Sequence, residues 1–499
     1  MTDHFDVLIV GAGLSGIGAA VHLQKDCPDR SFAILEGRAA IGGTWDLFRY
    51  PGIRSDSDMF TLGYKFKPWT AAKAIADGPS ILSYVRETAA ENDVERHIRF
   101  DHKASAASWS SAEARWTVTV VRSDGSRHDL TCSFLFMNSG YYSYAEGHRP
   151  AFAGEGDFTG RIVHPQFWPE DLDYAGKRVV VIGSGATAVT LVPEMAKTAA
   201  HVTMLQRSPT YVVSRPGSDA IADGLRKYLP AKLAYSLIRV KNIGLGMLFY
   251  SRSRKAPDKI RDLIVGGVSQ HLGADYDVAT HFTPRYNPWD QRLCLVPDAD
   301  LFAAIKAGTA SVATDTIERF TPTGIRLASG ADLPADVIVT ATGLKMIALG
   351  GMTLSVDGRA VKPGDRVLYK GMMISGVPNL ALTFGYINAS WTLRSDLIAL
   401  YVGRILNHMK ATKTTVATPV PGPDVVPERP ALDLTSGYVQ RGADAMPKSG
   451  NRSPWKVTAN YVIDTMELRF GKVDDGELRF TRAVAVPAEV AEVAVPLAA

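Results

Sequence analysis

The stretch that decides the fold is "FDVLIVGAGLSGIGAAVHLQ", residues Phe5–Gln24. A short apolar run, typical of a buried strand, leads into Gly11, Gly13 and Gly16, and a helical pattern follows. The first glycine permits a tight turn, the second lets the backbone approach a pyrophosphate, and the third lets the helix pack on the strand. The free N–H groups at the start of that helix face the phosphates. We interpret the stretch as the start of a dinucleotide-binding domain.

An acidic residue at the end of the next strand strengthens this interpretation. "SFAILEGR" is a second apolar strand that ends at Glu36, twenty residues after Gly16. A carboxylate at this position accepts hydrogen bonds from a ribose 2′-OH. It would repel a 2′-phosphate, so the first site is expected to take a dinucleotide with a free ribose, such as FAD.

The same pattern occurs a second time. "KRVVVIGSGATAVTLVPEMA" contains a strand, a GxGxxA turn and a helix. The residues of this turn expected to bind the cofactor are Gly183, Ser184, Gly185, Thr187 and Ala188. The following strand, in "HVTMLQRSP", ends at Arg207 and Ser208 rather than at an acid. A guanidinium binds a 2′-phosphate bidentately, so we expect this second site to prefer NADPH.

Two further strands indicate how the two dinucleotide-binding domains are connected. "FLFMNSGYY", Phe134–Tyr142, looks like an outbound crossover, and "DVIVTATGL", Asp336–Leu344, looks like the return. The expected fold class is therefore α/β, with two Rossmann-like domains and the NADP domain inserted into the FAD domain. We place the FAD domain at residues 1–144 and 341–499, the latter including a C-terminal segment. The NADP domain takes residues 145–340, with a helical insertion at about 220–275.

Composition and charge narrow the class of protein. The 499 residues are 46% apolar and 21% charged, which is typical of a globular chain with a real core. A net charge of +4 is mild and argues against nucleic acid as a partner. Cys27, Cys132 and Cys294 are far apart and form no CxxC, which argues against a dithiol reductase and for a reducing compartment such as the cytoplasm. We expect no metal.

Two more motifs resemble those of a known family. In "FTGRIVHPQFWPED", Phe158–Asp171, the residues Phe158, Gly160, His164, Trp168 and Pro169 match F-x-G-x-x-x-H-x-x-x-W-P. This pattern, together with "GGTWDLFRYPGIRSD" at Gly42–Asp56, resembles the Baeyer–Villiger monooxygenases. Related N- and S-oxygenating flavin monooxygenases lack the Trp-Pro ending. In the sequence the first motif fits neither a helix nor a strand, and we expect it to be a stiff connector between the two domains.

The resemblance implies a reaction and the residues that carry it. It implies an enzyme that uses FAD, NADPH and O2 to insert oxygen next to a ketone carbonyl, and to oxidise sulfides, through a C4a-peroxyflavin. Arg292, in "YNPWDQRLCLVPDADLF", aligns with the family's active-site arginine, a fixed cation for the developing negative charge. Asp56 aligns with its carboxylate partner, although the sequence also allows Asp56 to be a helix N-cap. His164 would couple domain movement to cofactor position.

Further cofactor contacts are expected around the flavin. Gly43, Thr44 and Trp45 belong to the second family motif and would line the FAD. "GVPNLALTFGYINASW", Gly376–Trp391, looks like the last FAD segment, where a helix start near Asn388 would face the pyrimidine edge of the flavin. Many relatives carry Lys where this chain has Gln291, which leaves more of the NADP selectivity to Arg207.

The stretch Arg226–Arg261 is basic and interleaved with apolar residues. It predicts either a solvated helical cap or a helix that lies on an anionic membrane. The expected substrate is a small hydrophobic ketone or sulfide, and composition says nothing of the oligomeric state. Two other functions stay open at this point: an N- or S-oxygenating flavin monooxygenase that does not accept ketones, and a non-catalytic flavoprotein that senses NADP(H). The Trp168-Pro169 step argues against the N- or S-oxygenating enzyme, and Arg292 argues against both that enzyme and the sensor.

Overall fold

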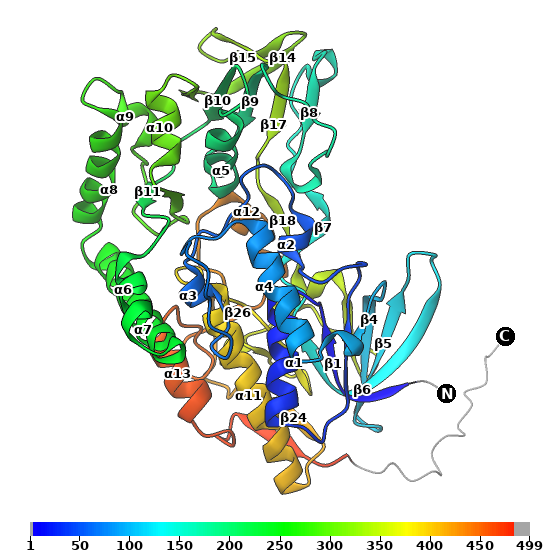
Figure 1. Cartoon of the computed structure of the whole chain (residues 1–499). Helices are drawn as coiled ribbons and strands as arrows, with labels where there is room; N and C mark the ends of the chain where they lie inside the picture. Colours follow the sequence, from blue (N-terminus) through cyan, green and yellow to red (C-terminus); the bar gives the residue numbers. More distant parts are fainter. Residues whose placement is uncertain (1–2, 484–499) are drawn as a thin grey trace, which may run out of the picture.

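The computed structural model describes residues 3–483 and contains two large sheets flanked by helices, the first mixed and the second parallel (Figure 1). Residues 484–499, the end of the expected C-terminal segment, lie outside the described residues. The first sheet is built around β1, His4–Val10, which pairs in parallel with β2, Phe32–Leu35, and with β6, Arg127–Met137. The parallel part has the order β3-β2-β1-β6-β23, with β3 at Ile98–Arg99 and β23 at Leu380–Leu382.

The first half of β6 belongs to an antiparallel extension of the same sheet. It pairs with β5, Arg115–Val121, which pairs with β4, Lys103–Ser110. Alternate residues of β5 are buried, as expected for a strand with one face on the core. The edge beyond β4 is completed by β19, Thr353–Val356, and β20, Arg359–Ala360.

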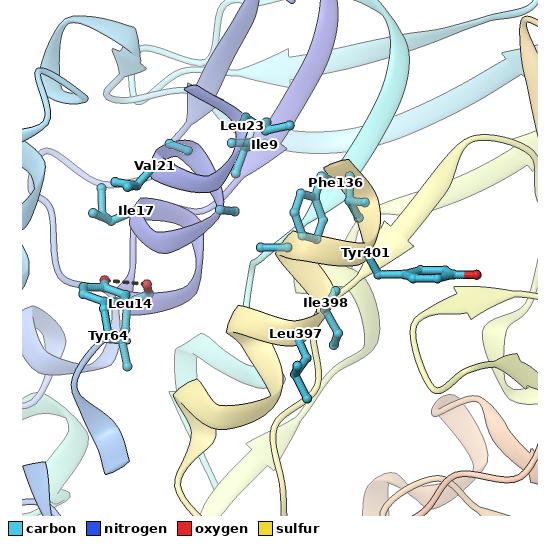
Figure 2. Close-up of a cluster of buried hydrophobic side chains, with 14 of the residues drawn as sticks. Ile9, Leu14, Ile17, Val21, Leu23, Tyr64, Phe136, Leu397, Ile398 and Tyr401 are labelled. Atoms are coloured by element: carbon cyan, nitrogen blue, oxygen red, sulfur yellow. Dashed lines mark hydrogen bonds between the residues drawn. The ribbon is translucent and has the colours of Figure 1, made fainter. Parts of the chain in front are cut away.

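Helices α1, Leu14–Asp26, and α11, Trp391–Thr412, pack side by side over the first sheet. Figure 2 shows the buried cluster between them, to which Ile9 and Phe136 contribute from the sheet. Tyr64 also enters this cluster, and its hydroxyl donates to the Leu14 carbonyl at 2.6 Å. The remaining helices of this unit are α2 at Thr44–Leu47, α3 at Met59–Leu62 and α4 at Gly78–Glu91.

The second sheet is parallel and has the order β13-β10-β9-β17-β8. Its strands are β8 at Arg161–Val163, β9 at Arg178–Ile182, β10 at His201–Gln206, β13 at Ala310–Thr314 and β17 at Val337–Thr340. Helices α5, Ala186–Met195, and α10, Asp300–Lys306, contribute to its buried cluster. A small antiparallel sheet adjoins it, formed by β14 at Ile317–Thr321, β15 at Gly324–Leu327 and β16 at Asp332–Pro334.

One expectation about the connector is wrong. Residues Arg161–Val163 are strand β8, because they pair in parallel with β17 at the edge of the second sheet. The chain becomes irregular only after β8, beginning with the 3-10 turn η3 at Pro165–Phe167. Phe158 packs on Phe320 within the same unit, and Trp168 packs on Tyr174. The motif is therefore built into the second unit rather than suspended between the two.

The two units are joined by two short antiparallel strands. They are β7, Tyr142–Gly147, which continues from β6, and β18, Leu344–Met346, which continues from β17. Thr342, just before β18, donates its hydroxyl hydrogen to the carbonyl of His148, just after β7. The chain therefore leaves the first unit and returns to it through one paired ribbon.

Helices inserted in the second unit run down the flank of the molecule (Figure 1). They are α6, Ala220–Tyr228, α7, Ala231–Lys255, and α8, Pro257–Leu272. Arg239 of α7 is buried and donates hydrogen bonds to the carbonyls of Phe60 in α3 and of Gly63 directly after it. This contact fixes the insertion to the first unit. Helix α9, Val278–Phe282, lies nearby. Strands β11, Val212–Arg215, and β12, Cys294–Pro297, also lie nearby and pair with each other in parallel.

The C-terminal segment consists of short elements on the first unit. Its helices are α12 at Gly437–Gly442, α13 at Tyr461–Thr465 and the π-turn η7 at Met466–Phe470. Its short strands are β24 at Val416–Pro419, β25 at Pro427–Pro430, β26 at Lys448–Gly450 and β27 at Leu478–Thr481. Two further short strands precede α11: β21 at Leu368–Tyr369 and β22 at Met373–Ile374. Within residues 3–483, no helix is both long enough and apolar enough to cross a membrane.

Candidate active site

The first glycine turn has the geometry that a dinucleotide requires. Gly11 has φ +104°, and a Cβ there would lie 2.6 Å from the Asn138 carbonyl oxygen. A Cβ on Gly16 would lie 1.8 Å from the Gly11 oxygen, so the helix start packs on the turn with no room for a side chain. Gly13 is the N-cap of α1, and no side chain caps the helix there. The first N–H groups of α1 are therefore available to an anion.

Glu36 lies at this turn. Its carboxylate accepts hydrogen bonds from the backbone N–H of Ala12 at 2.8 Å and of Arg38 at 3.0 Å. Burial raises the pKa of Glu36, and these two hydrogen bonds oppose that effect. The second family motif lies against the same turn, since a Cβ on Gly43 would lie 3.1 Å from Gly13 Cα. Thr44 and Trp45 follow Gly43 in α2, and a Cβ on Gly43 would lie 3.1 Å from the Tyr144 hydroxyl oxygen.

The second glycine turn repeats this arrangement at the end of β9. Gly183 has φ +136°, and a Cβ there would lie 2.4 Å from the Ala341 oxygen. Gly185 is the N-cap of α5, again without a side-chain cap, and a Cβ there would meet open space. Ala188 is fully buried in α5. An exposed backbone that no side chain covers is what the approach of a pyrophosphate needs.

Side chains from the neighbouring strand line this second turn. The Ser184 hydroxyl lies 3.3 Å from the Ser208 carbonyl, to which it donates, and 2.8 Å from the Thr210 hydroxyl. Arg207 is exposed directly after β10, at the position where the 2′ substituent of a bound ribose is read. Cys294 donates its thiol hydrogen to the Ser184 carbonyl, and burial raises the pKa of the thiol to about 12. The buried thiol is therefore uncharged.

Arg292 and Asp56 meet where segments from both turns come together, since Asp56 ends the motif that packs on the first turn and Cys294, two residues after Arg292, donates to Ser184 in the second. Arg292 Nη2 lies 2.8 Å from Asp56 Oδ2, and 32% and 30% of the two side chains are exposed. Asp56 chiefly raises the pKa of Arg292 above its ordinary value, so the guanidinium is a permanent cation. The alternative role of Asp56 as a helix N-cap is wrong, because Asp58 caps α3 by accepting from the Thr61 N–H. The pair brings together residues from two distant segments.

Three tyrosines surround this ion pair, and sequence reasoning missed all three as site residues. Tyr141 and Tyr142 come from the outbound crossover, and their hydroxyls are 3.0 Å apart. Tyr438 of α12 packs on Tyr142 with ring centroids 6.3 Å apart, and the Arg292 charge opposes the rise that burial causes in the pKa of Tyr438. The segment before α12 is tied to the Arg292 loop by the Thr435 N–H, which donates to the Asp290 carbonyl at 2.8 Å. The "GYY" step of the crossover was the only signal for Tyr141 and Tyr142.

His164, directly after β8, packs against the paired ribbon. A Cβ added to Gly147, the last residue of β7, would lie 2.1 Å from its ring, and its Nδ1 accepts from the Gln166 N–H at 3.2 Å. Burial chiefly lowers the pKa of His164, and burial together with the Arg149 charge outweighs the backbone contacts at Gly343 and His148 that raise it, so the ring is neutral near pH 7. The structure thus sets His164 against the backbone where the chain crosses between units.

The start of α11 lies beside the start of α1. The Trp391 indole N–H donates to the Ser15 hydroxyl at 2.7 Å, and the Ser390 hydroxyl lies 2.6 Å from that of Thr61 in α3. Asn388, just before this helix start, donates to the Ala459 carbonyl at 2.9 Å. Its Oδ1 is buried and accepts no hydrogen bond from residues 3–483. A buried carbonyl oxygen of this kind fits a ligand N–H such as that of a flavin pyrimidine ring.

The segment Gly42–Asp56 also makes the contacts between the units. Tyr50 packs on the buried cluster of the second unit, a Cβ on Gly52 would lie 3.1 Å from the Thr190 carbonyl oxygen of α5, and Arg54 forms an ion pair with Asp300 of α10. Asp46 is buried and holds three arginines, with Nη2 of Arg38 2.7 Å from its Oδ2. The segment Gly42–Asp56 therefore contacts the first turn, helices α5 and α10 of the second unit, and Arg292. Nothing in the sequence indicated that Asp46 and Arg54 take part in these contacts.

Each unit carries a glycine turn followed by a helix start that no side chain caps, and a two-stranded ribbon joins the two units. This arrangement defines a class of flavoproteins with two dinucleotide-binding units. Solved structures with this fold include steroid monooxygenase bound to NADP, with a TM-score of 0.74, 23% identity and coverage of 96% of this chain and 100% of that chain. Another is the complex of OTEMO with FAD and NADP, with a TM-score of 0.70, 22% identity and coverage of 84% and 88%. The fold is that of Baeyer–Villiger monooxygenases.

Sequence comparison identifies the family. The family description "Flavin-binding monooxygenase-like" matches residues 75–224, and "NAD(P)-binding Rossmann-like domain" matches residues 9–71. The FAD-containing monooxygenase EthA of Mycobacterium tuberculosis is 56% identical over 97% of this chain and 99% of its own length. The probable FAD-binding monooxygenase AlmA of Acinetobacter baylyi is 49% identical over 97% of each chain. The chain belongs to the family of FAD-containing monooxygenases.

Proposed function

We propose that the chain is an NADPH- and O2-dependent Baeyer–Villiger monooxygenase that also oxidises sulfides. In the proposed reaction a ketone, O2, NADPH and a proton give an ester or lactone, NADP⁺ and water. One oxygen atom enters the bond between the carbonyl carbon and its neighbour, and the other leaves as water. The observation that carries the proposal is the Arg292–Asp56 ion pair at 2.8 Å, set between two glycine turns that each fit a dinucleotide.

The cofactor contacts follow from the two turns. We assign FAD to Gly11, Gly13, Gly16 and Glu36, because the start of α1 is uncapped and the carboxylate lies at the turn. Gly43, Thr44 and Trp45, with Asn388, complete the flavin side of this assignment. We assign NADPH to the second turn, with Arg207 on the 2′-phosphate. The residues of that set are Gly183, Ser184, Gly185, Thr187, Ala188, Arg207 and Ser208. Bound FAD supplies the activation of O2.

The chain's own side chains act on charge and position. We assign Arg292 to the negative charge that develops on the carbonyl oxygen of the substrate, since a preorganised cation is worth most where water is scarce. Asp56 orients that guanidinium and takes no proton in the proposed scheme. His164 acts as a positioning residue on the ribbon between the units. This use of a permanent cation distinguishes the proposal from a non-catalytic NADP(H) sensor, which has no developing charge to stabilise.

We infer the same division of the chain as the sequence suggests, with residues 1–144 and 341–499 in the FAD domain and 145–340 in the NADP domain. The pairing of β7 with β18 supports these boundaries. We propose a small hydrophobic ketone or sulfide as substrate, because aromatic rings surround Arg292. A reducing compartment, the cytoplasm, suits the three free and buried cysteines.

A product screen tests the proposal. Purified enzyme is incubated with NADPH, ¹⁸O2 and a panel of linear, cyclic and aryl ketones and sulfides. We expect labelled esters or lactones and labelled sulfoxides, with one heavy atom per product. Sulfoxides without any ester would assign the chain to the N- and S-oxygenating type. NADPH binding without labelled product from any substrate would favour the sensor.

A further inference from the structure

The inserted helices and the C-terminal segment carry most of the exposed large apolar side chains. Fifteen such side chains are exposed within residues 3–483. Eight of them lie on α6, α7 and α8: Ile221, Tyr228, Leu233, Leu237, Val240, Leu245, Leu248 and Leu263. Four more lie on α13 and η7: Val462, Ile463, Met466 and Phe470. Such a concentration marks an interaction surface rather than the scatter that is normal on a monomer.

The apolar residues of α7 form a stripe along one side of the helix. Leu233, Leu237, Val240 and Leu248 recur at helical spacing and are 49%, 45%, 69% and 50% exposed. The opposite side of α7 is the one fixed to the protein, where Tyr235 and Arg239 are buried and donate to carbonyls of the segment before Lys65. The helix therefore has two apolar sides, of which only one is covered by residues 3–483.

The second group of apolar residues is part of the same side of the molecule. Helix α3 packs on both α7 and α11, and η7 packs on α11. Lys65, at the end of this layer, has its pKa lowered by burial and then by the nearby charges of Arg469 in η7 and Arg239 in α7, so both elements lie near Lys65. In Figure 1 the lower end of α7 lies next to α13. We call the exposed apolar residues of α6, α7, α13 and η7 the apolar face.

Cations without acidic partners border the apolar face. Lys227 and Lys232 lie near the start of α7, and Arg252 and Lys255 near its end, all four exposed. Other cations of the insertion, Arg226, Lys241 and Arg254, are paired with acids, whereas these four have no carboxylate within 4 Å in the described part of the chain. Lys65 and Arg469 are exposed near η7. Apolar residues bordered by unpaired cations match a surface that is anionic outside and apolar beneath.

We propose that the apolar face docks on the surface of a membrane that contains anionic lipid. Leucine and valine side chains of α7 enter the boundary between head groups and acyl chains, and the bordering lysines and arginines contact the phosphates. A second copy of the chain is the competing occupant. Symmetric pairing of this face would set its unpaired cations against one another, whereas an anionic bilayer neutralises them. Docking would bring the segment that holds Asp58 and Asp56 close to the lipid, because Asn242 of α7 donates to Asp58 at 2.9 Å.

Vesicle flotation of the FAD-loaded enzyme tests the proposal. Vesicles of phosphatidylcholine alone are compared with vesicles that also contain phosphatidylglycerol. We expect binding to the anionic vesicles and little to the neutral ones. The double variant Leu237→Glu, Val240→Glu should lose binding, and Lys232→Glu should weaken it by about 5-fold or more. Phe470→Glu tests the second element of the face. Val426→Glu, at an exposed apolar side chain outside the face, is the matched control and should bind as the parent does.

The same variants separate the proposal from its competitor. All of them should keep bound FAD and a parental rate of NADPH oxidation in buffer, because none touches the two glycine turns or Arg292. Light scattering then reports the oligomeric state without lipid. The proposal is overturned if the parent ignores anionic vesicles, or if Val426→Glu loses as much binding as the double variant. It is also overturned if the parent does not float with vesicles but is an oligomer in solution, and the double variant is a monomer.

Discussion

Replacement of Arg292 by Ala removes the cation on which the proposed chemistry depends. The guanidinium is held by Asp56 at 2.8 Å and is flanked by tyrosine rings, so it is preorganised before substrate arrives. Loss of a preorganised partner for a developing oxyanion typically costs about 10²- to 10³-fold in rate. We expect Arg292→Ala to retain FAD, because its side chain is absent from the first glycine turn, and to lose ester formation by at least this factor. Arg292→Lys should recover only part of the lost rate of ester formation, since an ammonium lacks the planar, forked N–H donors of a guanidinium.

Asp56 should show a smaller effect that works through Arg292. Both side chains are about one-third exposed, so solvent screens the pair and reduces its worth to about 1–2 kcal/mol. Asp56→Asn is therefore expected to slow ester formation by about 5- to 30-fold. In the double variant the Asp56 change should add little to Arg292→Ala, because the group it orients is already gone.

The assay is initial-rate measurement with a cyclic ketone, with ester quantified by gas chromatography and FAD content by absorbance. Arg178→Ala is the matched control, because Arg178 and Asp336 form a more exposed ion pair, with oxygen and nitrogen 2.7 Å apart, at the other end of the second sheet. Ester formation by Arg292→Ala near the parental rate would refute the assignment. Additive losses in the double variant would show that Asp56 acts by another route.

Three further changes probe the cofactor sites and the fold. Gly13→Val should give a folded but colourless protein, because a Cβ there lies 3.5 Å from Gly43 Cα and fits the protein but not a pyrophosphate; a yellow variant at full FAD stoichiometry would contradict the assignment. Arg207→Ala should raise KM for NADPH by about 10- to 150-fold, for a charged contact worth roughly 1.5–3 kcal/mol, and leave KM for NADH nearly unchanged; an equal change with both would exclude a 2′-phosphate contact. His22 has its pKa raised to about 9: burial lowers it, and Asp26 and Asp396 more than offset that effect. The folded state thus binds the proton more tightly, so up to about 3 kcal/mol of stability is present below pH 6.5 and lost as pH rises through 9. Urea midpoints across this range should fall for the parent and stay flat for His22→Gln; parallel curves would show that His22 is not the titrating group.

The turns were predictable because their chemistry is local. A glycine that must take φ +104° or +136° directly after a buried strand is visible in the sequence, and Gly11 and Gly183 have these angles. The same holds for Glu36, which directly follows β2 and therefore lies beside the turn that follows β1. Adjacent parallel strands place their carboxyl ends together, so strand order converts sequence spacing into proximity.

Other features depend on contacts that no local pattern encodes. Arg161–Val163 is a strand because β17 pairs with it, although alternation in the sequence stops at Val163, where the strand also ends. Tyr438 reaches the Arg292 loop only because the segment before α12 is tied to Asp290. The pairing of Arg292 with Asp56 was expected from a family resemblance, since composition and periodicity carry no information on which distant side chains meet.

The inserted helices show where a pattern is informative but incomplete. The sequence of Arg226–Arg261 is basic and amphipathic, and it allowed either a solvated cap or a membrane-facing helix. The structure separates its cations into two kinds. Arg239 is buried among backbone carbonyls and holds α7 to the first unit, whereas Lys232 at the start of α7 and Lys255 at its end are exposed. A buried guanidinium that makes several hydrogen bonds costs far more to remove than an exposed lysine. Arg239→Ala should therefore detach the insertion from the first unit, while Lys232→Glu leaves the fold intact and changes only what the surface can bind.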